Sequence, residues 1–310
     1  MHMKKKNLST IALVLVFFVG LSVLLYPTIS DYWNSLHQSQ AIATYADSVA
    51  EMDEQDYEEM WNAAQEYNEK LFETGHGLGL KKKEKKEYNK LLNVSGTGIM
   101  SYIEIPKIKC SLPIYHGTDE GVLQIAIGHI EGSSLPVGGV NTHCVLSGHR
   151  GLPSAKLFSN LDKLEEGDIF MIRTLDQTLT YEVDQIRIVL PDEVDDLKIE
   201  EGKDLCTLVT CTPYGINSHR LLIRGTRIPY DGKYAEKVPL KPAPAVSDRP
   251  AEEQERKLGT RQWILFAIAA FGVAILLGIL APSGKKKGKA SSKTEETADQ
   301  RNKELSQNSK

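Results

Sequence analysis

The chain of 310 residues has no excess of basic residues and few cysteines. Its 37 Lys and Arg residues are balanced by 41 Asp and Glu residues, which gives a formal net charge of −4. Nucleic-acid-binding domains are usually basic, so this balance argues against a nucleic-acid partner. No two of the four cysteines have C-x-x-C spacing. The nearest pair, Cys206 and Cys211, is separated by four residues, so no structural zinc site is expected.

The cysteines also lack an obvious disulfide pattern. An oxidising compartment would permit two disulfides among Cys110, Cys144, Cys206 and Cys211. However, Cys144 and Cys206 lie inside apolar runs typical of strands, where cysteine commonly serves as a small buried hydrophobic residue. We therefore expect these two residues to be buried free thiols.

Charge is absent from two long stretches, residues 7–30 and 262–284. Each is long enough to cross a hydrocarbon core of about 30 Å as a helix. The first could be a signal peptide, but its apolar run exceeds the usual signal length and no small-x-small cleavage site follows it closely. The second is apolar on all faces, unlike a helix on the surface of a soluble domain. The sequence thus predicts an uncleaved N-terminal anchor (1–30) and a C-terminal transmembrane helix (262–284).

Lysine clusters set the expected orientation of these two helices. Lys4–Lys6 precede the first, and Lys285–Lys287 follow the second. Basic flanks stay on the cytoplasmic side, so both termini should be cytoplasmic and residues 31–261 should lie outside the cell membrane. This predicts a multi-pass protein with two spans, membrane lipid as a partner and an extracytoplasmic working domain.

The pattern of apolar residues divides the chain further. Helical spacing predicts a helical N-terminal region over 31–95, interrupted by Gly75–Gly79. Residues 96–231 are rich in short strand patterns, followed by a Pro-rich linker (232–261) and, after the second span, a disordered tail (285–310). Short helices are expected at Glu120–Ile127 and Ala155–Leu164. The expected strands are Ile99–Ile105, Ile108–Tyr115, Thr142–Ser147, Asp168–Arg173, Leu179–Leu190, Leu205–Cys211 and Arg220–Ile228. Many short strands in one domain indicate a closed barrel or a sandwich.

Cys211 stands where a predicted strand ends. Pro213 and Gly215 force a turn directly afterwards, and Arg220 opens the next strand, so a hairpin can bring Arg220 beside Cys211. Such a thiol is accessible to a ligand, although a cysteine in this position can equally be structural. A nucleophilic cysteine also needs a base nearby, because the thiolate is the reactive form.

Several histidines in the β-rich region could supply that base. His149 follows Gly148 and comes shortly before Gly151, a setting that leaves its ring exposed at a strand end. His219, beside Arg220, is a weaker rival. His129 and His143 are better interpreted as packing or hydrogen-bonding residues. The residue pattern alone leaves the choice open.

Two long motifs resemble those of sortases. The runs Ser134–Gly139 and Leu146–Pro153 are similar to the histidine region of that family, and Thr210–Leu222 is similar to its cysteine–arginine hairpin. The resemblance extends from about Ile99 to Tyr230 and is closest to class C, the pilus-assembling branch. It implies a mainly β fold, a closed eight-stranded barrel with N-terminal helices and two flanking transmembrane helices.

The resemblance also implies a chemistry and partners. Cys211 would be the nucleophile, His149 the proton-transfer residue and Arg220 the oxyanion stabiliser of a cysteine transpeptidase that needs no cofactor or metal. Its substrates would be pilin or surface proteins with a C-terminal Leu-Pro-x-Thr-Gly-like sorting signal, and a pilin lysine would be the acceptor. Alternatives are a cell-wall-anchoring sortase that uses a peptidoglycan precursor, a hydrolytic cysteine protease, and a non-catalytic adhesin or scaffold.

One family feature is missing from the sequence. Class C sortases usually carry a lid with an Asp-Pro-aromatic motif over the cysteine. No Asp-Pro dipeptide precedes the barrel here, and Pro27 is the only proline before Pro106. Gly75–Gly79 is the candidate for a shortened lid.

Overall fold

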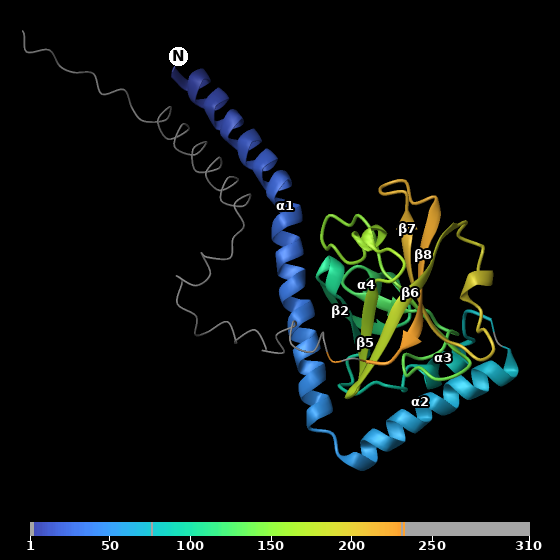
Figure 1. The fold of residues 1–310 in the computed structure, drawn as a ribbon. Helices are drawn as coiled ribbons and strands as arrows, with labels where there is room; N and C mark the ends of the chain where they lie inside the picture. The colour runs from blue at the N-terminus through green and yellow to red at the C-terminus, as the bar shows by residue number, and fades with distance from the viewer. Residues whose placement is uncertain (1–2, 76, 231, 233–310) are drawn as a thin grey trace, which may run out of the picture. The chain divides into compact units, whose positions relative to one another are not determined.

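The structure is a computed structural model that describes residues 3–75, 77–230 and 232. Four α-helices and eight strands make up this part of the chain (Figure 1). The helices are α1 (Met3–Ala50), α2 (Glu54–Thr74), α3 (Lys82–Tyr88) and α4 (Glu120–Leu123). The strands are β1 (Ile99–Ile105), β2 (Cys110–His116), β3 (Ile127–His129), β4 (Thr142–Ser147), β5 (Ile169–Thr174), β6 (Gln177–Val189), β7 (Asp204–Thr212) and β8 (His219–Ile228). Three short 3₁₀ turns, η1 (Pro106–Ile108), η2 (Leu161–Lys163) and η3 (Asp195–Leu197), lie between strands.

The eight strands form the closed barrel that the sequence predicts. Their order around the barrel is β1-β2-β3-β4-β7-β8-β6-β5. The pairs β2–β3 and β4–β7 are parallel, and the other neighbours are antiparallel. A closed sheet has no unpaired edge, so every strand of the barrel is held on both sides.

Alternation along the strands gives the barrel an apolar inside and a second apolar cluster outside. Inside, the stacked rings of Phe170 and Tyr181 have centroids 5.5 Å apart. Gly225 is required beside them, because a Cβ atom there would lie 2.7 Å from the Phe170 ring. Outside, Val145 of β4, Val209 of β7 and Leu222 of β8 pack beneath Leu197 of the β6–β7 segment. One face of the β4–β7–β8 sheet therefore supports this segment.

Helix α1 is docked along the barrel through its C-terminal half. The described residues from Val19 onward form one compact unit, which contains both this half and the barrel. The Tyr45 hydroxyl donates to the Met100 carbonyl at 3.0 Å and accepts from the Leu175 N–H at 2.8 Å. Burial raises the pKa of Tyr45 well above its ordinary range, so the ring stays neutral.

The helical N-terminal region is two long helices rather than one. The chain leaves α1 at Ala50, and Asp53 caps α2 by accepting from the Asp56 N–H at 2.8 Å. Gly75 ends α2 with φ 60°, a left-handed conformation that glycine adopts at low cost, so the predicted break at Gly75 is confirmed.

Gly75–Gly79, the candidate lid, lies far from Cys211 along the barrel. The Gly79 N–H donates to the Glu131 carbonyl at 2.7 Å, next to Ile130, whose N–H is bonded to the Val145 carbonyl of β4. Val145 pairs with Thr207, four residues before Cys211 on β7. At about 3.3 Å per residue this is roughly 13 Å along the sheet. The described part of the segment thus contacts the loop that follows β3, on the side of the barrel.

Both short helices predicted within the barrel region are largely wrong. Of Glu120–Ile127, only Glu120–Leu123 is helical, and Ile127 begins strand β3 instead. Three-residue β3 is too short to show an alternating pattern, so its pairing with β2 and β4 decides the conformation. Ala155–Leu164 contains only the 3₁₀ turn Leu161–Lys163, because the Phe158 N–H bonds back to the His149 carbonyl.

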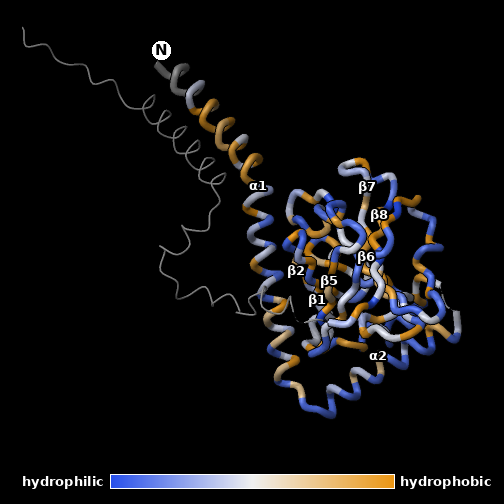
Figure 2. Tube along the Cα trace, viewed as in Figure 1, coloured by the Kyte–Doolittle hydropathy of each residue, from blue (hydrophilic) through white to orange (hydrophobic). Residues whose placement is uncertain are grey.

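Helix α1 contains a candidate membrane span near the N-terminus. By length and composition, Ser9–Ala50 is long and apolar enough to include a membrane-crossing segment. Figure 2 shows that the apolar residues are concentrated in the N-terminal half of α1. The predicted linker, second span and tail lie in 233–310, outside the described residues.

Candidate active site

The β7–β8 hairpin places Cys211 directly opposite Arg220. The two residues are paired in the register of the strands, so the neighbourhood that the sequence predicts is confirmed. The turn between them closes through bonds from the Ile216 and Asn217 N–H groups to the Pro213 carbonyl, at 3.1 and 3.0 Å. Cys211 is half-buried and makes no disulfide. The thiol therefore stands at the end of a rigid strand, beside a cation.

Strand β4 brings His149 to the same end of the sheet. It runs parallel to β7, with Ser147 beside Val209. The pairing continues beyond the strand, since the Gly148 N–H donates to the Val209 carbonyl at 3.1 Å and the Thr210 hydroxyl donates to the Gly148 carbonyl at 2.7 Å. The strand pairing ends at Ser147 and Val209; continued for two more residues, the same register would bring His149 to the level of Cys211.

Gly148 allows this close approach. A Cβ atom there would lie 2.5 Å from Ile127 Cδ1 and 2.7 Å from Phe158 Cδ2. The Phe158 N–H also donates to the His149 carbonyl at 3.1 Å. The backbone of His149 is thus fixed on both sides, whereas its half-buried ring has no hydrogen-bond partner within 3–75 and 77–230.

Arg220 is held by the turn that precedes it. Its Nη1 donates to the Asn217 carbonyl at 3.2 Å and to the His219 carbonyl at 3.1 Å. Asn217 adopts φ 62°, which turns its carbonyl toward the guanidinium. Among the described residues, Nε and Nη2 of Arg220 have no acceptor. A guanidinium has five donors, so this leaves directional donors for a negatively charged oxygen.

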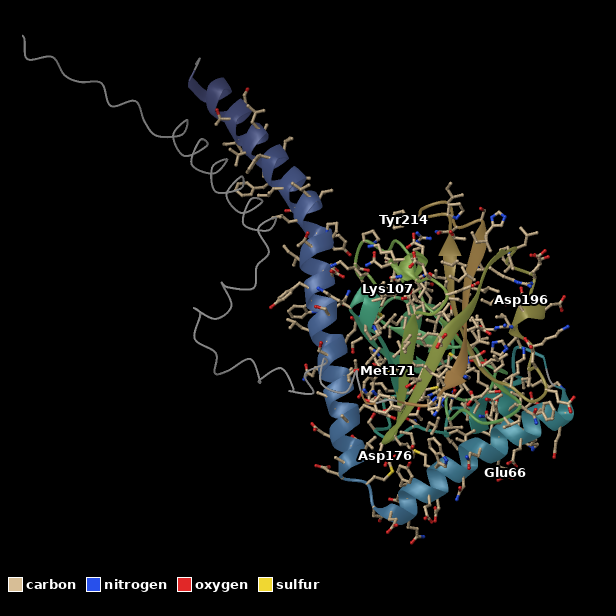
Figure 3. The ribbon with its side chains drawn as sticks, in the orientation of Figure 1. Glu66, Lys107, Met171, Asp176, Asp196 and Tyr214 are labelled. Atoms are coloured by element: carbon tan, nitrogen blue, oxygen red, sulfur yellow. The ribbon has the colours of Figure 1, made fainter. Side chains whose placement is uncertain are left out.

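Arg150 links the histidine loop to the cysteine hairpin, a role that the sequence analysis missed. Its Nη1 donates to the Thr212 hydroxyl at 3.2 Å, and its Nη2 pairs with the Asp162 carboxylate at 2.5 Å. The guanidinium also lies over the Tyr214 ring, 5.9 Å from its centroid, and only 9% of the side chain is exposed. Figure 3 shows Tyr214 in the turn after β7. The position of Arg150 directly after His149 is the only sequence signal for this contact.

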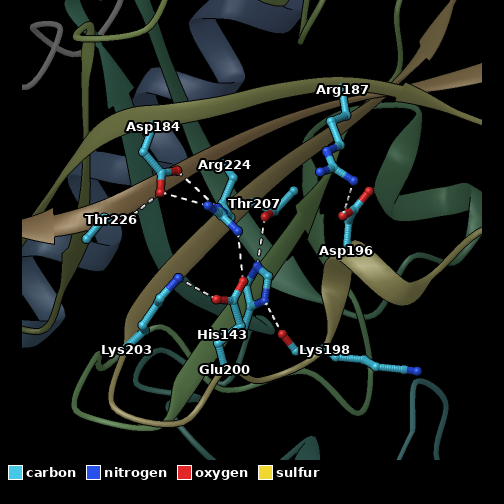
Figure 4. Close-up of polar contacts among 10 residues, drawn as sticks. All are labelled: His143, Asp184, Arg187, Asp196, Lys198, Glu200, Lys203, Thr207, Arg224 and Thr226. Carbon is cyan, nitrogen blue, oxygen red and sulfur yellow. Dashed lines mark hydrogen bonds and ion pairs between the residues drawn. The ribbon is translucent and has the colours of Figure 1, made fainter.

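The other histidines on the sheet are engaged in hydrogen bonds, as the sequence predicts. His143 is fully buried, with Nδ1 2.7 Å from the Lys198 carbonyl and Nε2 2.7 Å from the Thr207 hydroxyl (Figure 4). The carbonyl requires a donor, so Nδ1 carries the proton and Nε2 accepts from Thr207. Burial lowers the pKa of His143, and the nearby Arg224 guanidinium lowers it further. His129 is likewise buried, between the Tyr88 hydroxyl and the Ser134 carbonyl.

Arg224 fastens the β6–β7 segment to the same face of the sheet. It pairs with both carboxylate oxygens of Asp184, at 3.0 and 2.9 Å, and with Glu200 at 2.8 Å (Figure 4). The Asp184 carboxylate is partly desolvated, yet hydrogen bonds from Arg224 and Thr226 hold its pKa below the ordinary value. Arg224 and Asp184 thus have partners already, whereas the ring of His149 has none among the described residues.

The remaining cysteines are free thiols, as expected for Cys144 and Cys206. These two are register partners on β4 and β7, and both are buried inside the barrel. Burial raises the pKa of the Cys206 thiol well above its ordinary value, so it stays protonated. No group of three or more His, Cys, Asp or Glu side chains in the described part of the chain is arranged to hold a metal ion.

Comparison with known proteins identifies this arrangement. A model of the sortase domain matches residues 103–228. The fold matches sortase C1 of Streptococcus agalactiae with a TM-score of 0.59 and 57% identity, over 62% of this chain and 99% of that one. The chain belongs to the sortase family. Members of this family are cysteine transpeptidases.

Other sortases resemble the chain to different extents. Sortase C of Streptococcus pneumoniae, a protein discussed for its pilin substrate specificity, is 47% identical with a TM-score of 0.56, over 61% of this chain and 97% of that one. Sortase D of Bacillus subtilis is 34% identical over 129 residues, which make up 41% of this chain. The matched segment spans 62% of that relative, slightly less than two thirds of its length. Both of these solved structures are class C sortases, the class that the motifs predict.

Proposed function

We propose that this sortase is a membrane-anchored transpeptidase in which Cys211, His149 and Arg220 carry out acyl transfer. The observation that carries the proposal is the register of the sheet. Arg220 on β8 pairs directly with Cys211 on β7. His149 follows β4, the strand that pairs with β7 on its other side. A nucleophile flanked by a proton donor from one neighbouring strand and a cation from the other constitutes the minimum for this reaction.

In the first step, the Cys211 thiolate attacks the carbonyl carbon between Thr and Gly of a Leu-Pro-x-Thr-Gly-like signal. A carbon–sulfur bond forms and the carbonyl oxygen becomes an oxyanion, which the free donors of Arg220 can bind. Collapse restores the carbonyl and breaks the carbon–nitrogen bond, while His149 gives its proton to the leaving amine. The product is a thioester on Cys211.

In the second step, an acceptor amine attacks the thioester and returns a proton to His149. The released thiolate closes the cycle, so the reaction needs no oxidant or reductant. We propose a pilin lysine as the acceptor, because the solved structures that the chain resembles are class C sortases and one of them is a protein with pilin substrates. A peptidoglycan-precursor amine, used in cell-wall anchoring, is the alternative.

The proposal also places the enzyme in a membrane. Ile11–Ile29 is an uncharged stretch preceded by Lys4–Lys6, and basic residues favour the cytoplasmic side. The barrel, which follows this stretch, would then lie outside the cell. A C-terminal span over 262–284 is part of the same proposal.

A trapped intermediate tests the chemistry. Full-length protein in detergent, incubated with a sorting-signal peptide, should gain the mass of the acyl fragment on Cys211. The Cys211→Ala variant should gain none, whereas Cys110→Ala, which removes a thiol on β2, a strand that pairs with neither β7 nor β8, should behave as the native chain does. Equal peptide cleavage by the Cys211→Ala variant would refute the assignment.

A competition between acceptors tests the second step. The preformed thioester should be consumed faster by a pilin with its acceptor lysine than by the same pilin with that lysine changed to arginine. Faster consumption by a peptidoglycan-precursor amine would favour cell-wall anchoring. Consumption by water alone would indicate a protease, and unchanged function after alkylation of Cys211 would indicate a scaffold.

A further inference from the structure

The path of α1 along the barrel shows which end of the barrel lies nearer to residues 19–30, the part of the apolar segment that belongs to the same compact unit. The C-terminal half of the helix contacts the end where Leu175 lies, in the turn between β5 and β6, through the Tyr45 hydroxyl. Tyr45 is 14 positions beyond Asp31, or about 21 Å along a helix. The helix therefore extends along the barrel toward its opposite end.

At that opposite end, α1 is bonded to the loop that follows His149. Asp31 accepts from the Lys156 N–H at 2.9 Å and forms an ion pair with Lys156 Nζ at 2.8 Å. One turn later, Asn34 donates to the Ser154 carbonyl at 2.8 Å. The Phe158 N–H closes this loop on the His149 carbonyl. The catalytic end of the barrel is thus fixed to α1 at Asp31.

Asp31 is also the first charged residue after the uncharged stretch 7–30. Side chains of α1 just before it are exposed and apolar, and Trp33 just after it is 62% exposed. Exposed tryptophans next to an apolar span are typical of the membrane–water interface. The level of Asp31 therefore marks the bilayer surface, if α1 spans the membrane as proposed above.

The β7–β8 turn presents two exposed apolar side chains at this same end. Tyr214 is 62% exposed and Ile216 is 71% exposed. A Cβ atom on Gly151 would lie 3.1 Å from the Tyr214 ring, so this turn adjoins the loop that α1 holds. Figure 3 shows Tyr214 and Asp176 at opposite ends of the barrel. An exposed apolar side chain such as Ile216, beside a membrane surface, can enter the interfacial layer.

We infer that the β7–β8 turn contacts the bilayer, so that the catalytic end of the barrel faces the membrane and Ile216 lies in the lipid interface. The inference rests on the proposed anchorage by α1. It deepens that proposal by fixing the orientation of the site: Cys211 lies at the start of this turn and would act close to the lipid surface.

A matched pair of tryptophan probes tests the orientation. Val140 is 70% exposed, almost the same as Ile216, but precedes β4 at the other end of the barrel. In full-length protein with Trp33, Trp61 and Trp263 changed to Phe, a single tryptophan is placed by Ile216→Trp or Val140→Trp. Each protein is reconstituted in phosphatidylglycerol–phosphatidylcholine vesicles with acyl-chain-brominated lipid as the quencher. Circular dichroism confirms that both variants are folded.

The expected result is quenching about threefold stronger for Ile216→Trp than for Val140→Trp, because an interfacial side chain is buried by ~5–10 Å into the boundary between headgroups and acyl chains. Equal quenching, or stronger quenching at Val140, overturns the orientation, and a protein that does not float with the vesicles overturns it too. The probes report position whether or not the protein is active. A quenching result against the orientation would not affect the proposal of acyl transfer at Cys211. Likewise, the absence of an acyl-enzyme would not change the quenching pattern.

Discussion

Two histidines at opposite ends of β4, one within the strand and one just past it, have opposite surroundings. His143, near the start of the strand, is buried with both ring nitrogens in hydrogen bonds. His149, just past the end of the strand, is half-buried and its ring has no partner within the described residues. The surroundings of the two rings, rather than the residue type, separate their roles. The bonded ring of His143 supports the sheet, and the ring of His149 is available for the proton transfer proposed above.

The contrast extends to the neighbouring strands. At the His143 end, Arg224 is committed to Asp184 and Glu200. At the His149 end, the described partners of Arg220 are two backbone carbonyls, both bonded to Nη1. A polar cluster whose groups all have partners stabilises the sheet, whereas groups with donors to spare can bind a reacting group. Substitutions at the His143 end should therefore lower stability, and substitutions at the His149 end should lower activity.

The largest expected effect is on catalysis, from His149→Ala. We expect acyl-enzyme formation to slow by roughly 10²–10⁴-fold, because general acid–base catalysis contributes about that much. The unfolding midpoint should barely change, since no described residue bonds to the ring. Stopped-flow assays with a sorting peptide measure the rate. His219→Ala serves as the matched control, and a larger loss in that variant would transfer the role to His219.

The next effect concerns how precisely His149 is positioned. Arg150→Ala should lower kcat by about 10–100-fold with little change in KM, because a small displacement of a reacting group is costly. Arg150→Lys should restore only part of the rate, since an ammonium cannot reproduce the fork between Thr212 and Asp162. Steady-state kinetics across pH give both parameters. Arg187→Ala, which breaks an exposed pair with Asp196, is the control. A rise in KM alone would argue against a positioning role.

At the saturated end, the effect should appear in stability instead. His143→Gln should lower the free energy of unfolding by about 1–2 kcal/mol, because a buried hydrogen bond is lost. Activity should be largely retained. Urea denaturation followed by circular dichroism measures the change. Lys198→Ala makes a sharp control, since His143 bonds to the backbone carbonyl of Lys198 and not to its side chain. A comparable loss in that variant would contradict the explanation.

The smallest effect is the pH dependence that His143 contributes. Burial lowers its pKa in the folded protein, so the unfolded chain binds a proton first as the pH falls. Stability should be at its maximum above about pH 6.5 and decline below it, by at most about 1.4 kcal/mol per pH unit from this group. The His143→Gln variant should show a shallower decline between neutral and mildly acidic pH. Identical slopes in urea titrations of the two proteins would exclude this contribution.

Most of the barrel could be predicted from the sequence because its strands are long enough to show a pattern. Thr142–Ser147 is predicted with its observed bounds, and the strands around Cys211 and Arg220 are predicted within a residue. The helix predicted at Ala155–Leu164 is not formed, because the Phe158 N–H donates to the His149 carbonyl instead of to a carbonyl within the helix. Such a bond between distant positions leaves no local signal.

The same distinction applies to the site. A hairpin makes the Cys211–Arg220 pair visible in the sequence, because only one turn separates the two strands. His149 comes from a strand that is parallel to β7 and distant in the chain, so the pattern left several histidines open and family resemblance selected one. Arg150 was missed because its partners Asp162 and Thr212 meet it only in the folded barrel.

Tyr45 determines how much of the chain a soluble fragment must keep. Its ring packs with Ile99 and Tyr102, and its hydroxyl joins β1 to the turn after β5. A fragment cut to the matched family segment, residues 103–228, would lack Tyr45 together with the first residues of β1, and it would leave the Leu175 N–H without its acceptor. Anyone preparing the catalytic domain in soluble form should therefore begin it within α1, ahead of Asp31.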